Sequence, residues 1–341
     1  YFTLRQARTE HSVTEDLVFR SRGDKAYRWL LGAFGFYRHG TMNAPVHFKQ
    51  TGIEELILKY ANENDQSYRY SWGLKDGTGG DELFLGSDFR MPSAGGALYH
   101  ESNYTLGRWR FTAGLRFDFE HARLRYRNYT DTWYTKTHIK NETAYERPID
   151  IDDRSTLKQT FTELLPKFSV MYSFDETRNL YLTIAKGYKS GGFNTQIFSD
   201  VLQQKMMNRM GIGEVYDVQR GVAYKPEYSW NYEIGGHFSC MEGAVRGDFA
   251  LFYIDCRDQQ LTVFPPGQTT GRMMTNAGRT RSLGAEAAVQ ISPWRTFDIN
   301  LAYGYTDARF VRYETTVKND DGDPVRISYK DNRIPYAPQH T

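Results

Sequence analysis

Residues 109–120 alternate without interruption between apolar and polar side chains. The apolar positions are Trp109, Phe111, Ala113, Leu115, Phe117 and Phe119, and the positions between them are Arg110, Thr112, Gly114, Arg116, Asp118 and Glu120. Successive side chains of a β-strand point to opposite faces of the sheet. The segment therefore predicts a long strand that separates an apolar medium from a polar one.

Three other segments, 164–174, 228–234 and 297–306, show the same kind of alternation. Strands in globular proteins usually have about five or six residues, whereas a strand that crosses a bilayer needs roughly nine to eleven. The length of the alternating segments therefore favours a membrane. We expect an all-β protein, a transmembrane antiparallel β-barrel of the outer-membrane type.

The alternation also predicts which side chains face lipid and which face the lumen of the barrel. The lipid-facing set is Trp109, Phe111, Leu115, Phe117, Ile299, Leu301 and Tyr303. The lumen-facing set is Arg110, Arg116, Asp118, Glu286, Asp298 and Asn300. A charged side chain that faces lipid is costly, whereas one that faces a wet lumen needs only water or an opposite charge.

The composition is compatible with such a barrel. Mean hydropathy is −0.65, and no apolar run approaches the roughly 18 residues of a transmembrane helix, but barrels with a polar interior are not detected by hydropathy. Many of the 25 Tyr, 21 Phe and 6 Trp fall near expected strand ends, where membrane barrels carry aromatic girdles. The net charge of +2 indicates no preference for nucleic acid. The two cysteines, Cys240 and Cys256, lie about 40 Å apart in the expected hairpin, too far for a disulfide.

Short and long connections between the expected strands alternate along the chain. The short ones are 21–25, 105–108, 175–178, 241–244 and 293–295, and the long ones are 39–86, 127–159, 188–225, 261–273 and 311–334. Outer-membrane barrels have short periplasmic turns and long extracellular loops, so we expect roughly ten to twelve strands of this type. A soluble β-sandwich or propeller accounts for the alternation but not for loop lengths sorted by end.

Several motifs occur in a characteristic order. Residues 181–194 read YLTIAKGYKSGGFN, residues 225–238 read KPEYSWNYEIGGHF, and residues 276–289 read NAGRTRSLGAEAAV. The strand at 114–118 reads GLRFD. In this order and spacing the sequence resembles the C-terminal half of the barrel of TonB-dependent outer-membrane receptors, most clearly from about residue 89 to 341.

The resemblance implies a 22-stranded barrel closed by an N-terminal plug domain, which imports a scarce nutrient with energy from the inner-membrane protein TonB. We expect residues 1–341 to form part of a single barrel domain, with the plug, the TonB-binding segment and the terminal strands outside this chain. The start at Tyr1, without an initiator Met or signal peptide, fits a processed or truncated exported protein. Pro335, Pro338 and Thr341 are typical of the approach to a further strand.

Aromatic residues in the long connections are the candidate ligand contacts. They are Tyr129, Trp133, Tyr134, Tyr188, Phe193, Tyr216 and Phe264. Aromatic faces together with Arg or Lys can hold a ferric chelate through its catecholates or carboxylates. The alternative for each residue is an interfacial girdle or packing between loops.

Neither catalysis nor a resident metal is indicated. No nucleophile elbow, phosphate loop or dinucleotide fingerprint occurs, and Asp152 with Asp153 lies in an expected solvated loop. The run 320–323 contains three aspartates, but an EF-hand with its glycine at Gly322 would need acids at Val317 and Ser328. The eight histidines lack zinc-site spacing. We therefore expect no enzyme activity, no cofactor and no metal site.

The sequence as a whole favours a TonB-dependent importer of the bacterial outer membrane, with a ferric siderophore as the substrate that the family resemblance implies. Its expected partners are TonB, through a region outside this chain, the small-molecule ligand and the lipid bilayer, but not nucleic acid. Haem, cobalamin or an oligosaccharide remain alternative substrates, although the Phe-Arg-Ala-Pro run and nearby His of haem receptors are absent. A passive porin is the alternative from another functional class, and an outer-membrane hydrolase would need a catalytic set that is not recognisable.

Overall fold

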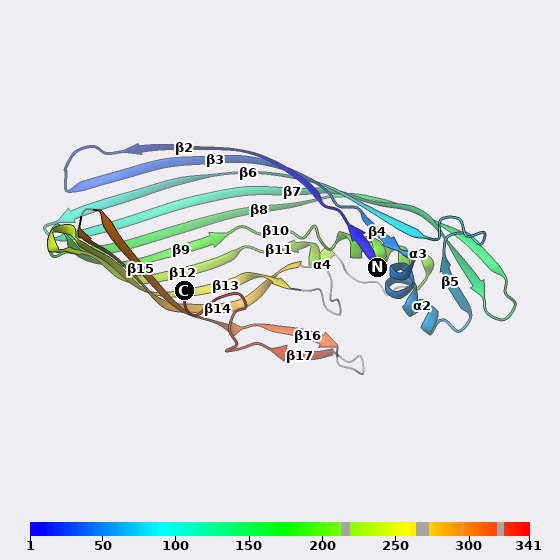
Figure 1. Ribbon diagram of the computed structural model, residues 1–341. Helices are drawn as coiled ribbons and strands as arrows, with labels where there is room; N and C mark the ends of the chain where they lie inside the picture. Colours follow the sequence, from blue (N-terminus) through cyan, green and yellow to red (C-terminus); the bar gives the residue numbers. More distant parts are fainter. Residues whose placement is uncertain (213–218, 264–272, 295, 319–323) are drawn as a thin grey trace.

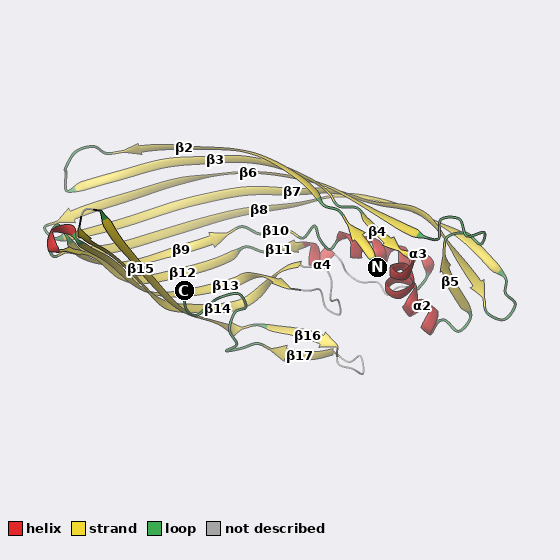
Figure 2. Cartoon of the chain, viewed as in Figure 1, coloured by secondary structure: helices red, strands yellow, loops and turns green. Residues whose placement is uncertain are grey.

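A single curved antiparallel sheet forms most of the molecule (Figure 1). The computed structural model describes residues 1–341 except 213–218, 264–272, 295 and 319–323. The sheet has 13 strands, and most of the helical elements lie towards one of its ends (Figure 2). Within the part of the chain that the structure describes, none of the helices combines the length and hydropathy needed to cross a membrane.

Ten long strands follow one another across this sheet in chain order, each antiparallel to the next. They are β2 (Ala7–Arg20), β3 (Tyr27–Asn43), β6 (Glu82–Leu106), β7 (Trp109–His138), β8 (Ala144–Ser173), β9 (Arg178–Lys189), β12 (Glu227–Cys240), β13 (Val245–Val263), β14 (Met273–Trp294) and β15 (Phe297–Arg312). The expected all-β antiparallel fold with long strands is therefore confirmed.

The remaining elements are short. Near the N-terminus and between β3 and β6 they are β1 (Phe2–Leu4), β4 (Val46–Lys49), α1 (Gln50–Gly52), the π-helix η1 (Ile53–Leu58), α2 (Lys59–Asn64) and β5 (Tyr68–Trp72). Between β9 and β12 they are β10 (Gly192–Phe193), α3 (Phe198–Met210), α4 (Gln219–Val222) and β11 (Ala223–Tyr224). The 3-10 turn η2 (Met241–Gly243) joins β12 to β13, and β16 (Glu314–Lys318) pairs with β17 (Pro324–Ser328) beyond β15.

The short connections lie at one end of the sheet and the long ones at the other. Because each long strand runs antiparallel to the next, successive connections alternate between the two ends. In Figure 1 the short turns are on the left, and the helices of the long connections are on the right. We call the second end the long-connection end.

One expected loop is not a loop. Apart from the turn at 139–143, residues 127–159 belong to β7 and β8, each of 30 residues, which remain paired up to Thr137 and Ala144. The sequence interpretation was wrong here because the segment is rich in polar side chains. Its threonines, tyrosine and tryptophan nevertheless favour strands, and β5 pairs with the far end of β7.

Two chemically different faces follow from the alternation. On β7, Leu115 and Phe117 are each 48% exposed, while Arg116 and Asp118 lie on the opposite parity and form an ion pair of 2.7 Å between Nε and Oδ2. We call these the apolar face and the polar face. The register across β13, β14 and β15 places Leu301 and Tyr303 on the apolar face.

The other predicted lumen-facing residues follow the polar-face parity. These are Arg110 on β7, Glu286 on β14, and Asp298 and Asn300 on β15; the last three are exposed. The Nε atom of Arg110 is shielded from solvent and has no hydrogen-bond partner among the described residues. That this face lines a lumen stays a prediction.

At the long-connection end the polar face becomes apolar and is covered by α3. Phe89 of β6 and Leu124 of β7 are buried there against Phe198 of α3. The buried residues of α3 recur on one side of the helix, at Phe198, Val201, Leu202, Met206 and Met210. Burying a side chain of this size contributes about 1.5–3 kcal/mol. The connection between β9 and β12 is therefore anchored to the sheet by its own core.

Hydrogen bonds fix both ends of α3. The Nδ2 atom of Asn128 donates to the carbonyl oxygen of Phe198 at 3.2 Å, and Nε2 of Gln203 donates to the carbonyl oxygen of Leu56 in η1 at 3.1 Å. The helix ends at Gly211, whose φ of +78° lets its N–H and that of Ile212 bond back to the last turn. The fold thus connects α3 to both β7 and η1.

The C-terminal residues run along the free edge of β15. The backbones of Gly304 and Thr341 exchange two hydrogen bonds of 3.0 Å, and the N–H of Ile334 donates to Ala308 at 3.0 Å. This edge of the sheet is therefore paired over part of its length. Cys240 and Cys256, in β12 and β13, both carry free thiols.

The two faces predict opposite tolerance to charge at neighbouring positions of β15. In the full-length protein, Leu301→Arg should lower the free energy of unfolding from lipid vesicles by about 2–4 kcal/mol, because the guanidinium would enter hydrocarbon. Asn300→Arg should cost much less. Urea titrations followed by tryptophan fluorescence measure both changes, and equal costs would mean that the assignment of the faces is wrong.

Candidate functional site

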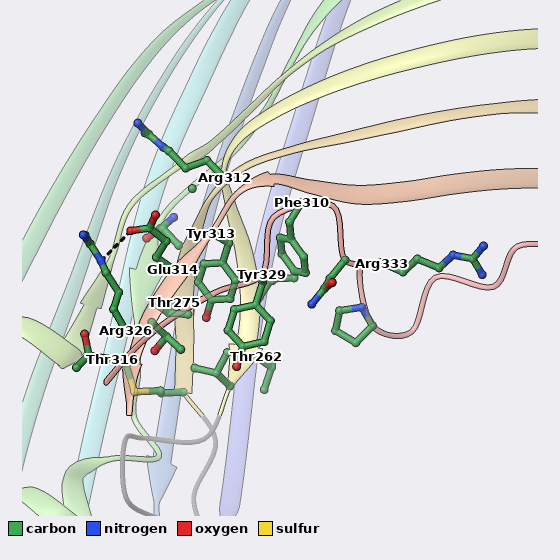
Figure 3. Close-up of a pocket in the computed structure, with 18 residues that line it drawn as sticks. Thr262, Thr275, Phe310, Arg312, Tyr313, Glu314, Thr316, Arg326, Tyr329 and Arg333 are labelled. Carbon is green, nitrogen blue, oxygen red and sulfur yellow. Dashed lines mark ion pairs between the residues drawn. The ribbon is translucent and has the colours of Figure 1, made fainter. Parts of the chain in front are cut away.

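Aromatic and arginine side chains gather around a pocket at the long-connection end of β13, β14 and β15 (Figure 3). Its volume is about 970 Å³. The residues that carry its chemistry are Phe310, Arg312, Tyr313, Glu314, Arg326, Tyr329 and Arg333. The sheet forms one side of the pocket, and the β16–β17 hairpin with the chain that follows it forms the other.

The path of the chain explains how these residues meet. β16 and β17 pair from Glu314 opposite Ser328, and the N–H of Tyr329 donates to the carbonyl oxygen of Tyr313 at 2.9 Å. The chain then turns at Asp331, whose φ is +64° and whose N–H bonds to the carbonyl oxygen of Phe310. Aspartate tolerates this left-handed conformation better than most residues.

Three aromatic rings form a continuous row in the pocket. The ring centroids of Phe310 and Tyr313 are 5.2 Å apart, and those of Tyr313 and Tyr329 are 5.3 Å apart with an interplanar angle of 30°. Phe310 is only 4% exposed and anchors the row to the sheet. Burial raises the pKa of the Tyr313 phenol, with a smaller contribution from Tyr329. Its hydroxyl group therefore stays protonated at neutral pH and can donate a hydrogen bond.

Positive charge exceeds negative charge around this row. The guanidinium Nε of Arg326 lies 2.8 Å from a carboxylate oxygen of Glu314, as the dashed line in Figure 3 shows. Arg312 is exposed and has no carboxylate within ion-pair distance among the described residues. Planar rings flanked by guanidinium groups suit an anion that is itself aromatic or carries carboxylates.

Tyr134, predicted as a ligand contact, is instead part of a core. It is 6% exposed and its ring lies 6.4 Å from that of Tyr70. β5 pairs with β7 at this level, and η1 and α3 cover the same cluster. The loop assignment was wrong, because the segment is a strand with a buried side, and ligand contact by Tyr134 stays a prediction.

The other predicted aromatic residues of β7 lie on the opposite side. Tyr129 is half-buried, with the guanidinium carbon of Arg127 4.5 Å from its ring centroid and the ring of Phe84 at 5.7 Å. Trp133 is 42% exposed. Both follow the parity of the apolar face, so they do not share a surface with Tyr134.

The remaining candidates are scattered. The ring of Tyr188 lies 5.9 Å from that of Tyr228, and its hydroxyl group is shielded from solvent without a hydrogen-bond partner among the described residues. Phe193 packs against the core around Phe198. Tyr216 and Phe264 lie outside the described residues. The structure therefore does not bring the predicted set together, and ligand contact by its members stays a prediction.

Sequence reasoning missed the aromatic row. Its signal is the density of tyrosine and arginine on both sides of the 319–323 segment, in FVRYE at 310–314 and RISYK at 326–330. That these two runs stack on one another depends on the hairpin between them. Nothing in the alternation predicts such a short hairpin beyond the end of β15.

Several carboxylates of the described residues form ion pairs with arginine or lysine. Asp152, expected in a loop, lies in β8 and accepts paired hydrogen bonds from Arg154 and Arg127, which hold its pKa well below its usual range. Among the described residues, no group of three or more His, Cys, Asp or Glu side chains is placed to bind a metal ion. The three aspartates of 320–323 lie outside the described residues.

Comparisons with known proteins agree with this architecture. A family model described as TonB dependent receptor-like, beta-barrel, matches residues 4–341. The pesticin receptor of Yersinia enterocolitica is 28% identical over 185 residues, and that of Yersinia pestis is 26% identical over the same length. These matches cover 54% of this chain and 22% of each relative.

A solved structure shows the same fold. The ferric yersiniabactin uptake receptor FyuA of Yersinia pestis superposes with a TM-score of 0.58 at 16% sequence identity. The superposition covers 99% of this chain and 40% of FyuA, so the chain spans less than half of the receptor that it resembles. Since the family model covers nearly the whole chain, the protein belongs to the β-barrel family of the TonB-dependent receptors, which lie in the bacterial outer membrane.

Proposed function

We propose that the full-length protein imports a ferric siderophore across the outer membrane with energy supplied through TonB. The observation that carries this proposal is the match of the receptor barrel family to residues 4–341. Residues 1–341 would form part of a single barrel domain. The plug and the segment that contacts TonB belong, on this proposal, to parts of the protein outside this chain.

The pocket chemistry supports the substrate class. A ferric siderophore presents anionic oxygen atoms, often on aromatic rings, around the metal. The row of Phe310, Tyr313 and Tyr329 offers flat apolar surfaces, and Arg312 offers a guanidinium group. FyuA, whose fold this chain shares, is described as a ferric yersiniabactin uptake receptor.

The structure also supports a transport path along the polar face. Arg116, Asp118 and Glu286 have the parity of this face, and each long strand between β2 and β15 is hydrogen-bonded to both neighbouring strands. A wall of this kind does not need to open when a ligand passes. Movement is then confined to loops and to the plug, which is where energy from TonB would act.

Dependence on TonB separates an energised importer from a passive porin. Cells that express the full-length protein should accumulate iron from a supplied ferric siderophore, tested over catecholate, phenolate, hydroxamate and citrate complexes of radioactive iron. Deleting TonB should abolish this uptake, because a plugged lumen gives a bulky chelate no passive route. Unchanged uptake without TonB would support the porin.

The pocket predicts a specific loss of affinity. Tyr329→Ala in the full-length protein should weaken binding of the transported chelate about threefold to thirtyfold, because one face for stacking and cation–π contact is lost. Tyr329→Phe keeps the ring and should bind nearly as the wild type does. Tyr145, an exposed tyrosine of β8 away from the pocket, provides the matched control Tyr145→Ala. Equal binding by Tyr329→Ala and the control, measured by fluorescence titration, would exclude the pocket as a ligand site.

The two ends of the sheet should face opposite sides of the membrane. An epitope tag inserted at 140–142, in the turn between β7 and β8, should be detected by antibody on intact cells. A tag at 175–177, between β8 and β9, should be detected only after the outer membrane is permeabilised. The reverse pattern would invert the orientation.

A further inference from the structure

The apolar face of β7 changes abruptly into a basic surface towards the long-connection end. After Phe119, the next positions of the same parity are His121, Arg123, Arg125 and Arg127. The neighbouring strands β6 and β8 add cations beside them. We define the basic patch as Arg90, Arg123, Arg125, Arg127, Arg154 and Lys158.

The patch points away from the interior of the molecule. Phe89 and Leu124, which lie on the opposite parity next to Arg90 and Arg123, are buried beneath α3. The cations therefore lie on the other side of the sheet from α3 and from the proposed transport path. Arg90 and Arg125 are exposed.

The register places like charges directly opposite one another. Arg90 is paired with Arg125, and Arg123 is paired with Lys158. Directly opposed like charges destabilise a sheet. Among the described residues, no carboxylate lies within ion-pair distance of these four cations. Arg123 donates only to the imidazole Nε2 of His121, at 2.8 Å.

A third pair of opposed cations differs from these two because a carboxylate neutralises it. Arg127 faces Arg154, and the carboxylate of Asp152 binds both guanidinium groups with N–O distances of 2.6–3.0 Å. The repulsion is neutralised within the protein. Asp88, two residues before Arg90 on the same face, is hydrogen-bonded to Asn43 at 2.6 Å and lies outside ion-pair distance of the cations. Among the described residues the other two pairs thus have no carboxylate bound to them, and an anion from outside the protein can take that place.

Strands β13 to β15 also carry several arginines, and two of them, Arg279 and Arg309, are neutralised within the protein. Asp255 lies 2.6 Å from Arg279, and Asp307 lies 2.9 Å from Arg309. Both sets lie beyond the apolar residues at the long-connection end. On β6, β7 and β8, in contrast, neither cation of the pairs Arg90–Arg125 and Arg123–Lys158 has a carboxylate within ion-pair distance among the described residues.

The position of the patch identifies the level at which this anion lies. The apolar residues of β7 extend from Trp109 to Phe119, eleven positions, which matches the roughly nine to eleven residues that cross the hydrocarbon of a bilayer. Arg123, the first cation of the patch on this strand, lies four residues beyond Phe119, at the level of the headgroups. A shallow hollow of about 380 Å³ opens on this surface, with Pro92, Ala94 and Tyr37 beside Arg123 and Arg125.

We propose that the basic patch binds the phosphate groups of a phosphorylated glycolipid in the outer leaflet of the membrane. The forked guanidinium groups of Arg90 and Arg125 suit phosphate oxygens, and acyl chains would lie against the apolar face immediately below. Inorganic phosphate would make no contact with the apolar face, whereas a lipid would contact both the cations and that face. The arrangement therefore favours a lipid over free phosphate. This interaction is separate from ligand transport, because it uses the opposite face of the sheet.

The test compares Arg90→Gln/Arg125→Gln with the wild type, both as full-length receptor purified in a nonionic detergent. The probe is lipid A with two phosphates, and retained lipid is counted by native mass spectrometry. Loss of two cations at a lipid headgroup should weaken binding about thirtyfold. The matched control is Arg22→Gln/Arg108→Gln, which removes two exposed arginines from the short turns and should bind as the wild type does.

Lipid A without its phosphates should bind the wild type no better than it binds the double variant. The proposal fails if the double variant retains lipid A as the wild type does, if dephosphorylated lipid A binds equally well, or if inorganic phosphate alone displaces the lipid completely.

Thermal unfolding keeps the test independent of folding defects. Because the double variant removes a like-charge pair, it should melt no lower than the wild type in detergent without lipid. Added lipid A should raise the melting temperature of the wild type but not of the variant. Arg123→Gln/Lys158→Gln removes the second opposed pair and should lose lipid A in the same way; normal binding by this variant would also overturn the proposal.

Discussion

The two-residue period of the strands is the constraint on which the rest of this structure depends. Neighbouring long strands are paired antiparallel in a register that keeps Leu115, Phe117 and their counterparts on one face and Arg116 and Asp118 on the other. A shift by one residue in any strand would exchange the two faces of that strand. The length of the strands, their pairing register and the separation of short from long connections therefore have one common cause. The sheet must form a wall between an apolar and a polar medium.

The same period has another consequence where the strands extend beyond the apolar band. On the polar face the side chains become apolar at Phe89 and Leu124, and α3 covers them. On the apolar face they become cationic at Arg123 and Arg125. The strands continue without a break, but one face now packs against α3 and the other is cationic. The level of the membrane can thus be read from the side chains of β7 alone.

The sequence was sufficient to predict the fold class, the long antiparallel strands and the separation of short from long connections, because all three depend on local alternation and turn residues. The sequence was insufficient to predict the structure of the segments beyond the apolar part of the strands. The extension of β7 and β8 to the turn at 139–143 was missed because its polar residues resemble a loop, and Tyr134 was placed in a loop for that reason although it lies on a buried side of β7. The aromatic row depends on Tyr329 returning to Tyr313 across the β16–β17 hairpin, a non-local contact that no alternation encodes.

The charged side chains on the two faces of the sheet differ in how they are neutralised. Arg116 on the polar face is neutralised by Asp118 two residues away, on the same side of the same strand, so that face requires no outside anion at this point. Arg90, on the other face, has Asp88 two residues away on the same side of β6, but that carboxylate accepts a hydrogen bond of 2.6 Å from Asn43 and is not within ion-pair distance of Arg90. Arg125 has no carboxylate at i±2 or directly across. Where no carboxylate pairs with an exposed cation of a strand, the opposing charge is supplied by solvent ions or by whatever lies beside the protein, and beside a membrane-spanning wall that neighbour is the lipid headgroup.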